Sequence, residues 1–278
     1  MSKQSLLQQC QKQYYLLLLA LSFFTRVPVN LPNVVKPEML HKASRYFALI
    51  GLFIGVVTAL MLILLSSFLP ISLAVLISMA CGLLLTGAFH EDGWADVCDG
   101  FGGGWTVEQK LNIMKDSRLG TYGAAGLFFI LMIKYQSLVL LSTYNENPVL
   151  ALSLALVLAH TLSRTVSTSL IFSMSYVSED AQSKVKPLAQ HLSLNGLLIL
   201  LITSAVVMFF ILPVLHCLVM IVCLWMIRFL LIIWFNRQLG GFTGDCLGAA
   251  QQLLEVAIYI VLLVLASPST AFFAEIRL

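Results

Sequence analysis

The sequence predicts an all-α, polytopic membrane protein with about seven transmembrane helices plus a short N-terminal helix that is re-entrant or interfacial. Composition gives the first reason: 59% of the 278 residues are hydrophobic, 10% are charged, and the mean hydropathy is +0.94. Soluble domains carry about 25% charged residues. The second reason is that apolar residues gather in stretches near the roughly 20 residues that a helix needs to cross a bilayer. We expect residues 1–278 to form a single integral-membrane domain.

The apolar stretches define the expected elements in chain order. The first, residues 14–24, is too short to cross comfortably and is broken by Thr25-Arg-Val-Pro-Val29, which favours an interfacial or re-entrant helix. It lacks the small-residue cleavage site of a signal peptide. Each later stretch approaches the length of a span. The expected spans are residues 46–69, 71–89, 122–142, 149–172, 195–212, 214–235 and 253–271.

Basic residues predict the orientation. Seven spans place the connections alternately on two sides of the membrane, and the short links near Pro70, Asn145 and Pro213 contain no Lys or Arg. The positive-inside rule therefore predicts a multi-pass protein of the cytoplasmic (inner) membrane whose long polar loops face the cytoplasm. The net charge of +3 reflects this topology and does not indicate a nucleic-acid partner. The basic side carries Arg26, Lys36, Lys42, Arg45, Lys110, Lys115, Arg118, Lys184, Lys186 and Arg237, and the other side carries Arg277.

Cysteine and isolated polar residues give weaker signals. The six cysteines form no Cys-x-x-Cys pair, so we expect free thiols. A zinc site would need close Cys and His spacing, and only Cys98 lies near His90. Lys134 lies nearer the opposite membrane face and His160 is isolated, so we expect no catalytic role for either.

Charge is concentrated in the segment His90-Glu-Asp-Gly-Trp-Ala-Asp-Val-Cys-Asp-Gly100. In a helix, Asp92, Asp96 and Asp99 would fall at i, i+4 and i+7, within one stripe of the surface. Three aligned carboxylates repel one another unless a cation lies between them. Mg²⁺ is the cofactor we expect, because it takes hard oxygen ligands and is commonly held by a few carboxylates plus substrate phosphates. A solvated acidic loop is the alternative interpretation.

Two further segments lie on the same predicted side. In Met114-Lys-Asp-Ser-Arg-Leu-Gly-Thr-Tyr-Gly123, Asp116 could serve as a metal ligand or base, while Lys115 and Arg118 suit phosphate oxygens or simply anchor the next span. In Leu239-Gly-Gly-Phe-Thr-Gly-Asp-Cys-Leu-Gly248, Asp245 is a further candidate metal ligand, with helix capping as the alternative.

Acidic and basic residues also occur within the apolar stretches. Glu255 is costly in a membrane unless it is paired or faces a polar cavity. Arg164 and Arg228 lie about two turns inside the predicted boundary, where they either snorkel to the lipid headgroups or face inward and line a phosphate pocket. Apart from Glu255, every Asp and Glu is expected in a loop or at a helix end. Carboxylates for a metal and cationic groups for phosphate are the equipment of metal-assisted phosphoryl transfer, with a carboxylate or His90 taking the proton.

Together these residues resemble one family, the cobalamin synthases, also called adenosylcobinamide-GDP ribazoletransferases. The matching blocks run from near the amino terminus to the last span, so the resemblance covers nearly the whole chain. The blocks are Phe24-Thr-Arg-Val-Pro-Val29, His90-x-Asp-Gly-x-Ala-Asp-x-x-Asp-Gly100, Ile113-Met-x-Asp-Ser-Arg-Leu-Gly-Thr121, Ser163-Arg164 and Leu239-Gly-Gly-x-Thr-Gly-Asp-x-Leu-Gly-Ala249.

The resemblance implies Mg²⁺-dependent transfer of the adenosylcobinamide-phosphate group from adenosylcobinamide-GDP to α-ribazole or its 5′-phosphate. GMP is released, and the product completes the nucleotide loop of vitamin B12. The resemblance leaves room for a homo-oligomer or for association with other enzymes of nucleotide-loop assembly. It implies catalytic roles for His90, Asp92, Asp96, Asp99, Asp116 and Asp245, metal ligation by Asp92, Asp96, Asp99 and Asp245, and substrate binding by Lys115, Arg118, Arg164 and Arg237.

The chain departs from the family pattern at Glu91, where an apolar residue is common, so Glu91 is not expected to be a required ligand. Residues 173–194 match no pattern. A CDP-alcohol phosphotransferase is one competing interpretation, but its usual Asp-Gly-x-x-Ala-Arg differs from Asp92-Gly-Trp-Ala-Asp96. A divalent-cation transporter is another, but acidic residues confined to loops and helix ends would not line a membrane path.

Overall fold

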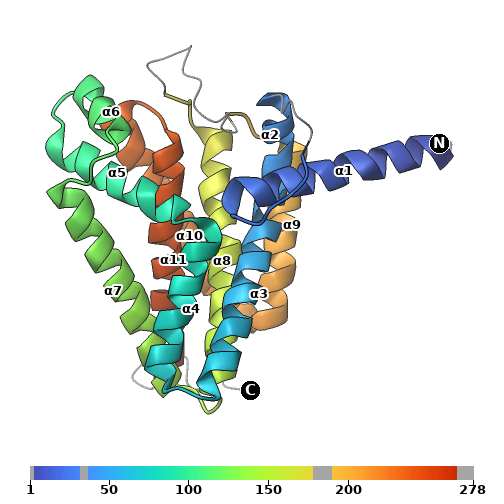
Figure 1. The fold of residues 1–278 in the computed structure, drawn as a ribbon, viewed down its shortest axis with the longest axis vertical. Coiled ribbons are helices and arrows are strands. Elements are labelled where there is room, and N and C mark those ends of the chain that lie inside the picture. The colour runs from blue at the N-terminus through green and yellow to red at the C-terminus, as the bar shows by residue number, and fades with distance from the viewer. Residues whose placement is uncertain (1–2, 32–36, 178–189, 268–278) are drawn as a thin grey trace.

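A computed structural model describes residues 3–31, 37–177 and 190–267, and in these ranges the chain is almost entirely helical (Figure 1). The only bridge between extended segments within them joins Tyr176 to Phe242. The poorly matched stretch 173–194 lies largely in residues 178–189, outside the described residues. The helices are α1 (Lys3–Phe24), α2 (Pro37–Ala43), α3 (Phe47–Ser66), α4 (Ile71–Thr86), α5 (Phe89–Gly103), α6 (Val107–Lys115), α7 (Thr121–Thr143), α8 (Pro148–Ser173), α9 (Leu194–Ile211), α10 (Val214–Leu239) and α11 (Gly244–Ala266), with a 3₁₀ turn, Ser44–Tyr46, joining α2 to α3.

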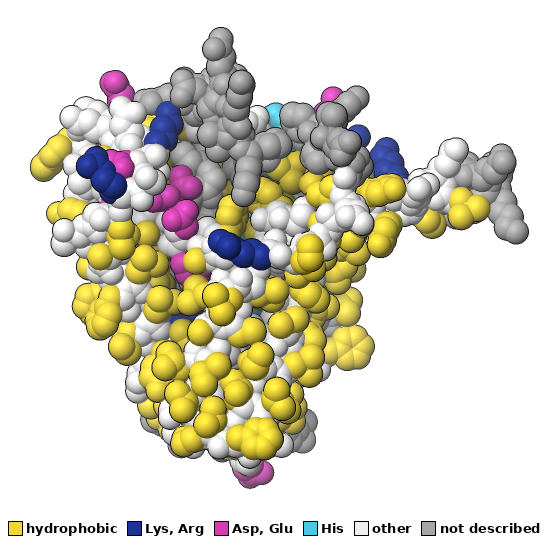
Figure 2. All heavy atoms as spheres, viewed as in Figure 1, with side chains coloured by type: hydrophobic (Ala, Val, Ile, Leu, Met, Phe, Trp, Pro, Cys, Tyr) yellow, Lys and Arg dark blue, Asp and Glu magenta, His cyan; other side chains and the backbone are white. Residues whose placement is uncertain are grey.

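The helices form a multi-pass membrane bundle, as predicted. Six helical segments are long and apolar enough to cross a bilayer, and the pair α4 and α5 could count as a seventh, broken span. Figure 1 shows α3, α4 and α7 to α11 running lengthwise, while α5 turns across one end of the bundle. We call the end that carries α5 and α6 the acidic end. Charged side chains gather there on the face drawn in Figure 2, and hydrophobic side chains cover most of the bundle below it.

The expected span 71–89 is shorter than predicted because α4 ends at Thr86 and α5 leaves it at 88°. Gly87 and Ala88 make this bend with left-handed φ angles of 65° and 56°. The side chain of Arg26 lies against Gly87, where a Cβ would come within 2.2 Å of Arg26 Nε, and Arg26 N donates to Leu85 O at 2.8 Å. The chain after α1 therefore fixes the corner from which α5 departs. After this corner, α5 runs across the end of the bundle and not along it (Figure 1).

The N-terminal helix is longer than the predicted segment 14–24. α1 has 22 residues and is not among the candidate spans, and Figure 1 shows it lying across the bundle axis. The first half of α1 is polar and rich in Gln and Lys, so hydropathy alone did not indicate where the helix begins. The helix is held to the bundle partly by Tyr46, whose hydroxyl donates to Gln13 Oε1 at 2.7 Å.

The predicted start of the last span, residue 253, is wrong. α11 begins at Gly244, where Thr243 Oγ1 accepts a hydrogen bond from Cys246 N at 3.3 Å. The first turns are polar, yet Gln251 and Gln252 are buried and hydrogen-bonded inside the bundle, so they interrupt the hydropathy without interrupting the helix.

Close packing of small residues holds the core helices together. A Cβ at Gly51 would lie 2.2 Å from the carbonyl oxygen of His160, and one at Gly55 would lie 2.7 Å from Cα of Val157, so α3 and α8 touch backbone to backbone. Such contacts are typical of helix association in membranes. All six cysteines are free, as predicted.

Candidate active site

The acidic motif is helical, and α5 separates its polar residues onto two faces. At 100° per residue, Asp92, Asp96 and Asp99 fall on one stripe, as the spacing predicted. Asp92 is exposed and Asp96 is half-buried. His90 and Glu91 lie on other faces and are buried, with 3% and 8% of their surfaces exposed. The alternative interpretation, that this segment is a solvated acidic loop, is therefore wrong.

The start of α11 lies directly against α5. A Cβ at Gly93 would lie 2.9 Å from the backbone oxygen of Asp245 and 3.3 Å from Cα of Gly248. Glycine at position 93 thus lets the two backbones touch, which brings Asp245 beside the acidic stripe. Asp245 belongs to the first turn of α11, and the cap of that helix is Thr243. The alternative that Asp245 is itself the cap is therefore wrong.

The gathered carboxylates repel one another. Burial, and then the nearby charges of Asp245, Asp92 and Asp99, raise the pKa of Asp96 to about 7. Such mutual repulsion favours a cation. Within the described ranges, no three His, Cys, Asp or Glu side chains lie close enough together to enclose a metal ion. Hard carboxylate oxygens still suit Mg²⁺, which is usually held by one or two carboxylates plus substrate phosphates and so does not need a complete protein cage.

Asp99 has a second task that the sequence did not reveal. Its Oδ2 accepts a hydrogen bond from Gly120 N at 2.7 Å, and its Oδ1 accepts one from Gly123 N at 2.8 Å. Asp99 therefore caps the first turn of α7, and the glycines of the segment Met114–Gly123 give its carboxylate room to approach. Metal ligation by Asp99 stays a prediction, and it would have to share oxygens that are already hydrogen-bonded.

The segment between α6 and α7 presents the other predicted polar residues. Arg118 Nη2 pairs with Asp116 Oδ2 at 2.6 Å, and the Arg118 side chain is 87% exposed. Hydrogen bonds from Arg118 hold the pKa of Asp116 at about 2. Lys115 and Arg237 are also exposed, Arg237 in the last turn of α10. Arg118 and Arg237 are thus open to solvent, where a soluble anion could reach them.

His90 and Arg164 lie away from the acidic stripe. The His90 ring stacks on Phe24 with centroids 5.1 Å apart, and the Arg164 guanidinium lies over the same Phe24 ring at 5.8 Å. Arg164 is 2% exposed and donates to His160 O at 3.0 Å. The snorkelling alternative is therefore wrong for Arg164, which faces inward. Neither residue is placed to touch a substrate at the acidic face of α5.

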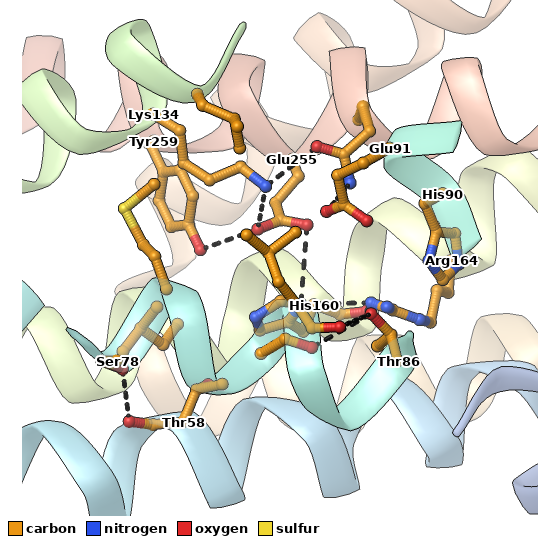
Figure 3. Close-up of a pocket in the computed structure, with 16 residues that line it drawn as sticks. Thr58, Ser78, Thr86, His90, Glu91, Lys134, His160, Arg164, Glu255 and Tyr259 are labelled. Carbon is orange, nitrogen blue, oxygen red and sulfur yellow. Dashed lines mark hydrogen bonds and ion pairs between the residues drawn. The ribbon is translucent and has the colours of Figure 1, made fainter. Parts of the chain in front are cut away.

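Beneath α5 the structure gathers a polar cluster that the sequence reading missed (Figure 3). Glu255 Oε1 lies 3.0 Å from Lys134 Nζ, and Glu255 Oε2 lies 3.5 Å from His160 Nδ1. Lys134 and His160 are therefore not isolated, because both pair with Glu255 inside the bundle. Glu91 is bonded here too, and its Oε1 accepts from Gln252 Nε2 at 2.8 Å. The only sequence signal was the cost of Glu255 inside a span, which required a partner.

Comparison with known proteins adds what geometry alone does not. The family model described as cobalamin-5-phosphate synthase matches residues 16–263. The chain belongs to the cobalamin-5-phosphate synthase family. A relative named adenosylcobinamide-GDP ribazoletransferase from Shewanella frigidimarina is 52% identical over 252 residues, covering 91% of this chain and 95% of the relative. One of the same name from Shewanella piezotolerans is 50% identical over 258 residues, covering 93% and 98%.

These matches decide between the interpretations that the sequence left open. Members of the cobalamin-5-phosphate synthase family are transferases, so this chain is a membrane enzyme. The CDP-alcohol phosphotransferase and transporter interpretations lose their support. No solved structure matches the chain.

Proposed function

We propose that this chain transfers the adenosylcobinamide-phosphate group from adenosylcobinamide-GDP to α-ribazole or its 5′-phosphate, with release of GMP and a requirement for Mg²⁺. The observation that carries the proposal is the meeting of Asp92 and Asp96 on α5 with Asp245 on α11, at the acidic end of a membrane bundle of this family. The names of the relatives supply the substrate class.

In the proposed reaction, a hydroxyl oxygen of the acceptor bonds to the phosphorus that carries the cobinamide arm. The bond from that phosphorus to the bridging oxygen breaks, and the bridging oxygen leaves with GMP. The hydroxyl proton passes to a carboxylate of the acidic stripe, since His90 is buried on another face. Mg²⁺ held by Asp92, Asp96 and Asp245 would neutralise charge on the diphosphate. Arg118, exposed in the segment between α6 and α7, offers planar donors suited to phosphate oxygens.

We further propose that the acidic end faces the cytoplasm and that the bundle lies in the inner membrane. Basic residues at this end, including Arg26, Arg45, Lys110, Arg118 and Arg237, support this orientation through the positive-inside rule. Both substrates are large and polar, and α5 presents its carboxylates at the end of the bundle rather than along a path through it.

The test supplies detergent-purified protein with adenosylcobinamide-GDP, α-ribazole and Mg²⁺. We expect a cobalamin and GMP in equal amounts, with little product from an Asp92→Asn variant and normal product from Glu108→Gln. Glu108 is an exposed acidic residue in the first turn of α6, so it controls for loss of surface charge. If the wild-type protein released no GMP, the proposal would be overturned. Release of CMP from a CDP-activated alcohol would favour the phosphotransferase interpretation instead.

A further inference from the structure

The polar cluster beneath α5 is balanced in charge. It contains Lys134 and Arg164 as cations and Glu91 and Glu255 as anions, all at most 8% exposed. Besides the contacts to Lys134 and His160, Glu255 accepts hydrogen bonds from Gln251 Nε2 at 2.6 Å and from the Tyr259 hydroxyl at 3.3 Å. Unpaired charges are expensive inside a membrane, so a cluster of two cations and two anions must act as a unit.

α5 enters this cluster through one charged residue, Glu91. Its Oε1 accepts from Gln252 Nε2 at 2.8 Å, and Gln252 Oε1 accepts in turn from Lys134 Nζ at 3.0 Å. Glu91 precedes Asp92 in the same helix, so the two side chains point about 100° apart. The hydrogen bond between Glu91 and Gln252 permits only a small rotation of α5 about its own axis. It therefore also limits the direction in which the side chains of the acidic stripe point.

Three atoms of the cluster are buried with no protein partner: Glu91 Oε2, His90 Nε2 and Arg164 Nε. The residues that carry them line one internal cavity of about 30 Å³, together with His160, Gln252 and Glu255 (Figure 3). A polar cavity above roughly 10–15 Å³ can hold a water molecule when two to four polar groups face it. This cavity has room for water and none for a nucleotide or a corrinoid.

We propose that this cluster is a hydrated positioning site, in which one or two water molecules bridge Glu91, His90 and Arg164, and the Glu91–Gln252 bond sets the rotation of α5. Glu91 and Gln252 are positioning residues that act on the substrates through the orientation of Asp92 and Asp96. The effect on turnover rests on the proposed function, whereas the effect on α5 itself does not. Gly93 determines how closely α5 approaches α11, and Glu91 determines the rotation of α5 about its own axis.

Hydrogen–deuterium exchange of the full-length protein in nanodiscs, without substrate, tests the positioning role. Glu91→Leu and Gln252→Leu should each raise exchange in residues 89–103 by about tenfold, since each removes a buried hydrogen bond to a charged group. Exchange in α9 should stay unchanged, which distinguishes positioning from general loss of stability. Glu91→Gln, which keeps an oxygen for Gln252, should show a smaller rise, and Glu108→Leu should show none.

Kinetics give the second readout. For Glu91→Leu we expect kcat to fall by about tenfold with KM within about twofold, because the substrates do not reach the cluster, and adding Gln252→Leu should cost little more. Unchanged exchange in α5, or equal increases in α5 and α9, would overturn the positioning role whatever the activity. If α5 responds and no transfer activity is found in any form, the proposed function fails and the positioning role stands.

Hydroxyl-radical footprinting by X-ray pulses tests the water. Tyr259 and Met220 are both fully buried, but only Tyr259 lines the cavity. We expect Tyr259 to be modified at several times the rate of Met220, although methionine is the more readily oxidised side chain. Equal protection of the two would show that the cavity is dry and would remove water from the proposal.

Discussion

Replacing Gly93 by alanine tests whether α5 and α11 must touch. The added Cβ would lie 2.9 Å from the carbonyl oxygen of Asp245, 3.0 Å from its Cα and 3.3 Å from Cα of Gly248, where ordinary contacts begin near 3.4 Å. All three neighbours are backbone atoms and cannot rotate away. The helices must therefore separate by about 0.5 Å, which moves Asp245 away from the acidic stripe.

The expected effect is larger on turnover than on stability. Alanine gains up to about 1 kcal/mol of helix propensity, which offsets part of the roughly 1–3 kcal/mol cost of overpacking. A misplacement of about 1 Å can cost about a hundredfold in rate, so a shift of half that size should lower kcat by about tenfold. GMP release at saturating substrate measures kcat, and thermal unfolding in detergent measures stability.

Gly103→Ala is the matched control, because it lies in the same helix and its Cβ would meet only Ile113 Cδ1, at 3.5 Å. It should keep normal turnover. Wild-type turnover in Gly93→Ala would refute the view that this contact brings the two acidic segments together.

The remaining predictions concern charge and topology. Asp92→Asn should lower turnover on the order of a hundredfold with an unchanged Tm, as when an electrostatic contributor to a transition state is removed; near-normal turnover would count against metal binding there. Asp99→Asn should also lower the free energy of unfolding, by about 1 kcal/mol, because the α7 cap is weakened, and an unchanged Tm would contradict the cap. Arg118→Lys should reduce kcat/KM while the Mg²⁺ concentration for half-maximal rate stays similar; a shifted Mg²⁺ requirement would place Arg118 in metal binding instead. In a cysteine-free background, a membrane-impermeant thiol reagent should label Ser117→Cys from the cytoplasm only and Glu146→Cys from the periplasm only, and the reverse pattern would invert the orientation.

Local periodicity carried the predictions that the structure confirms. The stripe of Asp92, Asp96 and Asp99 follows from helix geometry alone, and the apolar stretches follow from composition. The metal ligands that the resemblance implies are split between α5 and α11, so a shared site requires these helices to meet, and Gly93 does contact Asp245 and Gly248. The role of Gly93 in this approach could not be predicted from the sequence, because its neighbours on α11 are about 150 residues away along the chain.

Long-range partners account for what the sequence did not predict. Lys134 and Glu255 are separated by more than a hundred residues and lie in apolar helices, so neither position resembles a site when read alone. The start of α11 was missed for the same reason. Hydropathy penalises Gln251 and Gln252, whereas their hydrogen bonds inside the bundle make them acceptable there.

Because α5 has an exposed face and a buried face, a substitution of Glu91 is not a suitable control for substitutions in the acidic stripe. Asp92 is exposed on one face, while Glu91 is buried on another and carries half of the negative charge that balances Lys134 and Arg164. Removing the Glu91 charge would leave that cluster with one excess cation inside the bundle, a cost that falls on the position of α5. Loss of activity in Glu91→Gln is therefore compatible with metal binding by the stripe alone. Glu108 is exposed, so Glu108→Gln removes one negative charge without disturbing a buried cluster. It therefore distinguishes a general effect of lost negative charge from a specific effect of the stripe carboxylates.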